Sequence, residues 1–370
     1  MWKTTARLAD GREIIYFDES PALGRASVPD GREPPSPPAP AAAPAAAGAG
    51  GELRWDPLTA EWIAYAEHRQ DRTFLPAADS CPLCPSRPGR LTEIPAGDYD
   101  VVVFENRFPV LSGTGPSAVA GGLGERARAS GRCEVICFTA EHDGSFAALR
   151  PARASTVLAA WADRTAELSG RPGIEHVFCF ENRGPEVGAT LQHPHGQIYA
   201  LPFVPPRARQ LIASTQTYQA GHGANLFDDM VAAEIADGSR IVVRNEHWVA
   251  FVPAAAHWPF EVLLFPTRRV PDLASLAEPA VAAFGEIYPA VLRRLDTLFD
   301  APMPYLAAWQ QAPVGRSGED RAESALHLQL MPQRRAPGKL KYMASTETGA
   351  GIWSNDVLPE TAARMLREAC

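Results

Sequence analysis

Apolar residues in this chain gather into short runs of strand length, interrupted by a longer stretch with helical spacing, and the whole set occurs twice. The first set holds four short runs and one stretch in which apolar positions return every three or four residues. We therefore expect strands at 99–104, 134–139, 175–180 and 197–201, and a helix at 154–168.

The second set follows an Asp-Gly turn and repeats the order of the first. We expect strands at 240–243, 261–266, 305–309 and 325–331, and a long helix at 279–299. The run EVLLFP at Glu261 echoes EVICFT at Glu134, 127 residues earlier, and the two sets close on HPHGQIYALP and HLQLMP. This repeat predicts an α+β fold made of one unit duplicated in the chain, with two similar halves of antiparallel sheet and helix.

The chain before the first set contains two further segments. Residues 4–17 alternate in polarity around Asp10-Gly11, which predicts a small hairpin that could dock on the main body. Residues 34–51 contain only Pro, Ala, Ser and Gly, which predicts an extended tether, since the prolines weaken the alternative of a short alanine helix. We divide the chain into a hairpin segment (1–33), the tether (34–51) and two halves (52–210 and 211–370).

Composition narrows the class of partner. The chain carries 35 Lys+Arg against 43 Asp+Glu, a net charge of −8, which argues against nucleic acid as the main partner but allows a small local site for one anionic ligand. No run of 18 apolar residues and no signal-like start occurs, so we expect no membrane association and a cytoplasmic location. The six cysteines should then be thiols or metal ligands.

The sharpest chemical signal is His193-Pro194-His195-Gly196-Gln197. Two histidines at this spacing in a strand share a face, and Gly196 would let a ligand approach the backbone closely beside Gln197. A neutral imidazole can attack phosphorus while nearby donors hold the phosphoryl oxygens; the alternative is a histidine pair hydrogen-bonded in a turn. The second half keeps His327, Gln329 and Pro332 without the double histidine, so we expect the chemistry in the first half.

Cys81-Pro82-Leu83-Cys84 has the spacing of a zinc knuckle, and no thioredoxin-like helix follows to support a redox role. Its two remaining ligands would come from other histidines or cysteines, or the pair carries no metal. Arg69 and Arg72 could meet a phosphate or form a solvated surface. Phosphate-loop and nucleophile-elbow motifs are missing from the sequence.

These motifs stand among longer blocks that cover nearly the whole chain after the tether. The blocks include DPLTAEWIAYAEHRQDR (56–72), CPLC (81–84), VFENRFPVL (103–111), GRCEVICFTAEHD (131–143), FENRGPEVGATLQHPHGQIYALPF (180–203), a long block at 236–266 and KYMASTE (341–347). In these blocks the sequence resembles the galactose-1-phosphate uridylyltransferases of the histidine-triad superfamily. The resemblance implies a histidine-triad-like fold duplicated in one chain.

The resemblance also implies a reaction and its residues. UDP-glucose would transfer its uridylyl group to Nε2 of His195, and galactose 1-phosphate would then accept it as UDP-galactose, with Gln197 binding a phosphoryl oxygen. His142 and His193 would join Cys81 and Cys84 at one structural zinc, and a homodimer is implied because late residues of the family reach the partner's site. The implied substrate contacts are Arg69, Arg72, Asn106, Asn182, Gly188, Thr190, Lys341 and Glu347.

Some family members hold a second metal on a glutamate and three histidines. The corresponding places here read Leu211 or a neighbour, Gln310, His327 and Gln329, so three of the four ligands are absent and no second metal site is expected. Two alternatives remain open. One is a related nucleotidyl transferase or phosphorylase acting on ADP-sugars or dinucleoside polyphosphates. The other is a non-catalytic, zinc-stabilised nucleotide-binding protein, against which the intact His195 and Gln197 argue.

Overall fold

The computed structural model describes residues 1–21, 24–33, 51–71, 73–116, 118–315 and 318–369. The tether predicted at 34–51 lies outside the described residues except for Gly51, and Arg72 lies outside them as well.

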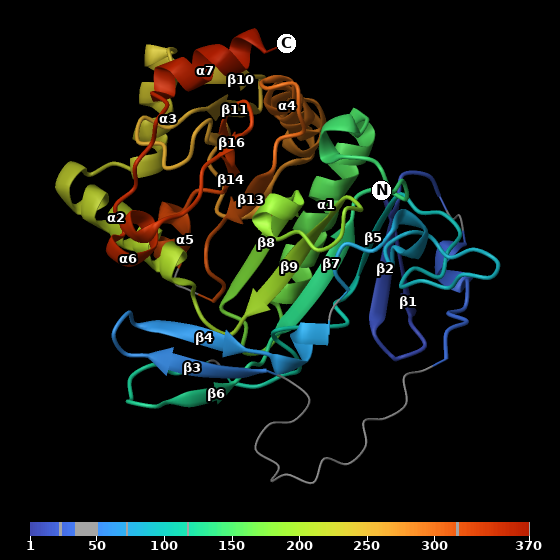
Figure 1. Ribbon diagram of the computed structural model, residues 1–370. Helices are drawn as coiled ribbons and strands as arrows, with labels where there is room; N and C mark the ends of the chain where they lie inside the picture. The colour runs from blue at the N-terminus through green and yellow to red at the C-terminus, as the bar shows by residue number, and fades with distance from the viewer. Residues whose placement is uncertain (22–23, 34–50, 72, 117, 316–317, 370) are drawn as a thin grey trace.

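An eleven-stranded antiparallel sheet forms the centre of the molecule, in the order β1-β2-β5-β7-β9-β8-β13-β14-β12-β11-β10 (Figure 1). Its strands are β1 (Trp2–Arg7), β2 (Glu13–Asp18), β5 (Val101–Glu105), β7 (Arg132–Cys137), β8 (His176–Arg183), β9 (His195–Leu201), β10 (Ile241–Arg244), β11 (Trp248–Phe251), β12 (Val262–Pro266), β13 (Tyr305–Gln310) and β14 (His327–Pro332). Two smaller sheets join β3 (Glu52–Asp56), β4 (Glu61–Tyr65) and β6 (Arg126–Arg128), and β15 (Arg334–Ala336) with β16 (Lys339–Leu340).

The order of the large sheet confirms the predicted duplication. Reading outward from the central pair β8 and β13, the strands β9, β7 and β5 on one side correspond to β14, β12 and β11 on the other. The helices α1 (Pro151–Ser169) and α4 (Glu278–Thr297) begin 127 residues apart, the same offset as Glu134 and Glu261. They pack so closely that a Cβ on Gly285 would lie 2.2 Å from the carbonyl oxygen of Pro151. The two halves therefore share one continuous sheet and core.

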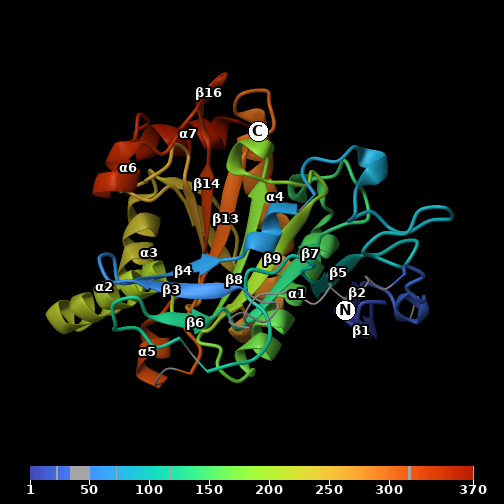
Figure 2. The ribbon, with the colours of Figure 1, turned by 60° about the horizontal axis from the view of Figure 1, so that its bottom comes forward.

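The predicted hairpin is confirmed and adds β1 and β2 to one edge of the large sheet, with β2 paired to β5. Ion pairs tie it to α1: Lys3 bonds Asp163 at 2.7 Å, and Arg153 bonds Glu19 at 2.5 Å. The small sheet of β3, β4 and β6 lies across the large one (Figure 2). The hairpin segment is thus packed directly onto the first half.

All expected strands and both long helices are present, with ends shifted by up to three residues. The sequence pattern missed α2 (Pro206–His222) and α3 (Leu226–Asp237), because each buries only two residues, such as Ala208 and Thr215 of α2, and so shows no apolar stripe. Three shorter α-helices follow: α5 (Gly318–Glu323), α6 (Ser345–Ala350) and α7 (Pro359–Glu368). Six 3-10 helices also occur in the described residues, at Arg25–Ser27, Glu67–Asp71, Ala78–Ser80, Phe146–Ala148, Pro185–Val187 and Leu273–Ser275. Of the helices in the described residues, none combines the length and apolarity needed to cross a bilayer.

Candidate active site

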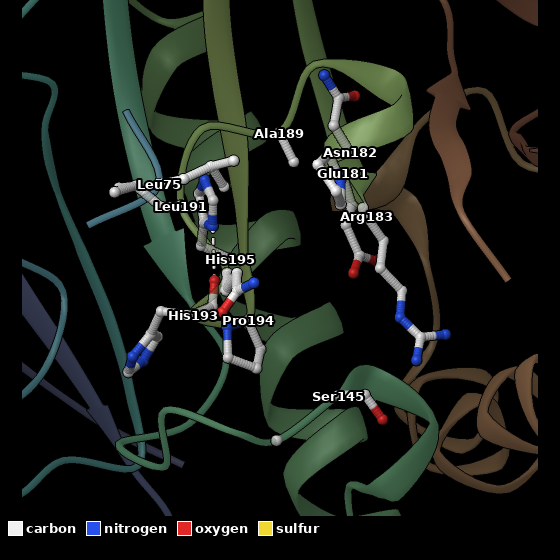
Figure 3. Close-up of a pocket in the computed structure, with 14 residues that line it drawn as sticks. Leu75, Ser145, Glu181, Asn182, Arg183, Ala189, Leu191, His193, Pro194 and His195 are labelled. Atoms are coloured by element: carbon white, nitrogen blue, oxygen red, sulfur yellow. Dashed lines mark hydrogen bonds between the residues drawn. The ribbon is translucent and has the colours of Figure 1, made fainter. Parts of the chain in front are cut away.

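His195 is the first residue of β9, between β7 and β8 in the middle of the first half. Its Nδ1–H donates to the carbonyl oxygen of His193 at 2.7 Å (Figure 3). This bond fixes the tautomer and leaves the Nε2 lone pair available for attack. Burial lowers the pKa of His195, which favours the neutral ring. The local fold therefore leaves one ring nitrogen of His195 with a free lone pair.

Two details of the HPHGQ interpretation are wrong. His193 and Pro194 form a bend before β9, and the rings of His193 and His195 point in different directions instead of sharing a strand face (Figure 3). A Cβ on Gly196 would meet the carbonyl oxygen of Phe180 at 2.8 Å and the Phe138 ring at 3.0 Å. Glycine is required here by packing inside the sheet, and the proposed approach of a ligand to its backbone does not explain it.

The larger of two cavities beside His195 has a volume of about 340 Å³. It brings together five of the predicted site residues, namely Arg69, Asn106, Thr190, His195 and Gln197. Apolar side chains, including Leu83, Phe104 and Phe108, form much of the remaining wall. A planar heterocycle with an attached phosphate fits this combination of apolar wall and polar end.

Tyr199 supports this cavity and was not among the predicted residues. Its hydroxyl donates to Oε1 of Gln197 at 3.1 Å and accepts from Arg69 at 3.4 Å. The bond orients the Gln197 amide so that its NH2 group is left to donate. Spacing could have identified Tyr199, because His195, Gln197 and Tyr199 alternate along β9 and share one face.

The smaller cavity, of about 170 Å³, lies at the end of β8 and is also lined by His195. Asn182, a predicted residue, lines it together with Ser145, Glu181 and Arg183. Arg183 is held by Asp296 at 2.7 Å. His195 therefore lines two cavities, a larger one with an apolar wall and a smaller one lined by both polar and apolar residues.

Glu181 is a buried carboxyl at the contact between the two halves. Tyr305 donates to its Oε1 at 3.0 Å, and its Oε2 has no hydrogen-bond partner among the described residues. Burial raises the pKa of Glu181 to about 8, although Tyr305 and the Arg183 charge oppose the shift, and Asp296 adds to it. The folded protein therefore keeps this carboxyl protonated at neutral pH.

We expect Glu181→Gln to remove the part of the pH dependence of the free energy of unfolding that comes from the Glu181 carboxyl. The folded state holds the Glu181 proton up to about pH 8, whereas the unfolded chain releases it near pH 4.3, so stability falls as pH rises between these values. The free energy of unfolding of the wild type, relative to the variant, should drop by about 1.4 kcal/mol per pH unit between about pH 5 and pH 7. Urea denaturation across this range measures it; Glu286→Gln, on an exposed position of α4, is the matched control. A constant difference between wild type and Glu181→Gln would contradict the prediction.

Cys81, Cys84, His142 and His193 form a group that could hold a metal, with ligand atoms all within 4.8 Å of one another. Cys84 Sγ lies 3.5 Å from Nδ1 of His142 and 3.7 Å from Nδ1 of His193. A tetrahedral zinc with Zn–S of about 2.3 Å and Zn–N of about 2.1 Å gives a sulfur-to-nitrogen edge of about 3.6 Å. The donor set and its spacing therefore fit a tetrahedral soft divalent ion.

Tyr99 completes the surroundings of this group and was also missed. Its hydroxyl donates to the carbonyl oxygen of Leu83 at 3.0 Å and lies 2.7 Å from Nε2 of His193, which also contacts the carbonyl oxygen of Thr139 at 2.8 Å. These contacts keep the proton on Nε2 and turn Nδ1 toward the cysteines. No local motif in the sequence marks a tyrosine for this position.

Models of both domains of galactose-1-phosphate uridyl transferase match the chain, the N-terminal domain over residues 48–205 and the C-terminal domain over residues 212–369. The chain belongs to the galactose-1-phosphate uridylyltransferase family. The family member from Streptomyces lividans is 45% identical, with the match covering 100% of this chain and 98% of that protein. The member from Thermotoga maritima is 36% identical, and the match covers 86% of this chain and 98% of that protein. A solved uridylyltransferase structure matches with a TM-score of 0.75 at 32% identity, covering 86% of this chain and 98% of its own.

Of the implied residues that the structure describes, Gly188, Lys341 and Glu347 do not line either cavity. Gly188 closes a short turn after Pro185–Val187, and Arg72 lies outside the described residues. Lys341 bonds Glu347 at 2.6 Å and the carbonyl oxygen of Ser354 at 2.7 Å. The hydrogen bond from Lys341 holds the pKa of Glu347 well below its usual range. Among the described residues, Lys341 and Glu347 therefore bond to each other and not to a group that lines either cavity.

Of the four positions compared above with a second metal site, three are Leu211, Gln310 and Gln329, and the fourth is a histidine, His327. Leu211 and Gln310 line a small cavity, and the ring of His327 stacks on Phe265 at 4.5 Å. Gln329 donates to Glu261 at 2.7 Å. These neighbours give His327 and Gln329 structural partners inside the second half.

Proposed function

We propose that the protein is a galactose-1-phosphate uridylyltransferase that exchanges UDP-glucose and galactose 1-phosphate for glucose 1-phosphate and UDP-galactose. The observation that carries the proposal is that His195 lines both cavities while its Nδ1 is held by the carbonyl of His193. A nucleophile with one free nitrogen between two cavities suits a group that is taken from one ligand and given to another.

In the first half-reaction, Nε2 of His195 attacks the α-phosphorus of UDP-glucose. A phosphorus–nitrogen bond forms, and the phosphorus–oxygen bond to glucose 1-phosphate breaks. In the second, an oxygen of galactose 1-phosphate attacks the uridylyl phosphorus, and the bond to nitrogen breaks. The carbonyl of His193 stabilises the charge that the ring gains, and the Gln197 amide donates to a nonbridging oxygen.

We assign the uridine to the larger cavity and the hexose phosphate to the smaller one. The apolar wall containing Leu83, Phe104 and Phe108 suits the base, while Arg69, Asn106 and Thr190 offer polar contacts. Asn182 lies in the smaller cavity, where a sugar or phosphate oxygen would need donors.

We propose zinc as the ion held by Cys81, Cys84, His142 and His193, because two thiolates and two imidazoles at tetrahedral spacing favour it. The ion would supply no step of the reaction. His193 contributes its ring to this group and its carbonyl to His195, so a metal there would position the nucleophile through the backbone of one residue.

We also propose a homodimer, in which Lys341 and Glu347 serve the site of the partner. Tyr342, Met343 and Ile352, beside this pair, expose 71%, 48% and 64% of their surface, which supports a contact there. A mixture of His195→Ala chains and Lys341→Ala chains tests the homodimer. Neither variant alone should be active, but mixed dimers formed by reassociation should regain activity. None of the described cysteines forms a disulfide, which supports a reducing, cytoplasmic location.

The decisive experiment supplies UDP-glucose without an acceptor. Intact mass should show one uridylyl group per chain, and an equal amount of glucose 1-phosphate should be released. Galactose 1-phosphate should then remove the adduct and give UDP-galactose. ADP-glucose is the matched donor for the alternative of an ADP-sugar phosphorylase; an adenylyl adduct with ADP-glucose, and none with UDP-glucose, would refute the proposal.

A further inference from the structure

Glu93 lines the larger cavity and is held by two arginines from the hairpin segment. Arg12 bonds Oε2 of Glu93, and Arg32 bonds its Oε1 at 2.8 Å. Only 9% of the Glu93 side chain is exposed, so its negative charge depends on these guanidinium groups. Residues from the start of the chain thus reach the wall of the nucleotide cavity.

The two arginines are themselves fixed within the segment. Arg12 bonds Asp10 at 2.7 Å and also the carbonyl oxygen of Glu105 at 2.8 Å, next to Asn106 in the cavity wall. Arg32 bonds Asp30 at 2.7 Å, and Asp30 accepts from the backbone of Ala9 at 2.9 Å. The carboxylates of Asp10 and Asp30 hold the two guanidinium groups in place, so their ion pairs with Glu93 have a defined geometry.

Glu93 in turn binds Arg107, which lines the larger cavity. Arg107 bonds Oε1 of Glu93 at 3.3 Å, and its guanidinium carbon lies 5.7 Å from the centre of the Phe108 ring. Arg107 and Phe108 both line the larger cavity. More than half of the Arg107 side chain, 55%, is exposed, so without Glu93 it would lose its one ion pair among the described residues and gain rotamer freedom.

The hairpin segment lies outside both domain models of the family, although the Streptomyces lividans relative matches the full length of this chain. The N-terminal domain model begins at residue 48, and the Thermotoga maritima relative covers 86% of this chain although 98% of its own length is matched. The segment is docked by contacts far from the cavity as well, including the ion pair of Lys3 with Asp163. Its arginines can therefore be changed while the segment stays attached.

We propose that the hairpin segment shapes the larger cavity, to which we assigned the uridine nucleotide. Arg12 and Arg32 are positioning residues that hold Glu93, and Glu93 holds Arg107 against Phe108, so the cavity is preorganised for the uridine nucleotide. This inference rests on the proposed function and adds that a segment outside the family's domains sets the affinity for the nucleotide. The bond between His195 and the His193 carbonyl is not part of this chain of contacts, so binding should change without the chemistry.

The test uses the full chain with Arg12→Gln and Arg32→Gln combined. We expect the KM for UDP-glucose and the dissociation constant for UDP, measured by calorimetry, to rise about five- to tenfold while kcat stays within about twofold. Arg7→Gln is the matched control, because Arg7 lies in the same hairpin and its side chain donates only to the carbonyl oxygen of Gly11 among the described residues. Equal affinities in the wild type and the double variant would overturn the inference.

Glu93→Gln provides a second, nearly isosteric test that does not depend on the arginine variants folding. It should raise the same two constants, and adding the Arg12 and Arg32 changes to it should raise them no further, since all three act through one carboxylate. Fully additive effects would overturn the inference. Failure of the proposed function is distinguishable: the wild type would then form no uridylyl adduct, whereas failure of this inference leaves the adduct and its concentration dependence intact in every variant.

Discussion

His195→Ala is expected to abolish the uridylyl adduct and to lower kcat by at least about a thousandfold. The methyl group cannot attack phosphorus, and no second imidazole can replace it: the ring of His193 turns its Nδ1 toward Cys84, 3.7 Å away, and its Nε2 toward Thr139. Intact mass after incubation with UDP-glucose, and steady-state formation of UDP-galactose, measure the two effects.

Two controls separate lost chemistry from lost binding or folding. His222→Ala removes an exposed histidine of α2 and should behave as the wild type. UDP should still bind His195→Ala with an affinity within about threefold of the wild type, because the apolar wall of the larger cavity is unchanged. A uridylyl adduct of normal yield on His195→Ala would show that another residue is the nucleophile.

Cys84→Ser is expected to remove the bound zinc and to lower the free energy of unfolding by about 4 kcal/mol or more. Cys84 contacts both histidines of the metal group, so its replacement removes the one thiolate that lies beside both imidazoles. With His193 less constrained, its carbonyl would hold His195 less well, and kcat should fall by at least about tenfold. Elemental analysis, urea denaturation and steady-state kinetics measure the three effects.

Cys133→Ser is the matched control for the metal prediction. Cys133 is fully buried in β7 but lies outside the metal group, so its replacement should cost some stability and leave one zinc per chain. Full zinc occupancy together with wild-type stability in Cys84→Ser would contradict the assigned ligand set.

The duplicated architecture could be predicted from the sequence because it depends on patterns local to the chain. Strand runs and helical spacing recur in the same order, Glu261 follows Glu134 by 127 residues, and α1 and α4 begin 127 residues apart in the structure. Helices α2 and α3 escaped prediction because they bury few side chains, and hydrophobic periodicity detects only elements with a buried face.

The chemistry-bearing residues of the candidate site could also be singled out, but not their arrangement. The HPHGQ motif marks His195 and Gln197, yet the bend that separates the directions of the two histidine rings depends on packing around Pro194 and Thr139. Tyr99 acquires its role from His193, 94 positions away, whereas Tyr199 could have been identified from its alternation with His195 and Gln197 along β9.

The two-part α+β fold, the family and the residue types suited to attack phosphorus or bind a metal follow from the sequence alone, because they depend on local patterns and motifs. The place of His195 between two cavities, the burial of Glu181 at the contact of the halves, and the ion pairs of Arg12 and Arg32 with Glu93 are known only from the folded structure. Each of these depends on contacts between residues distant in the chain, whose distances and burial are set by how the two halves and the hairpin pack together.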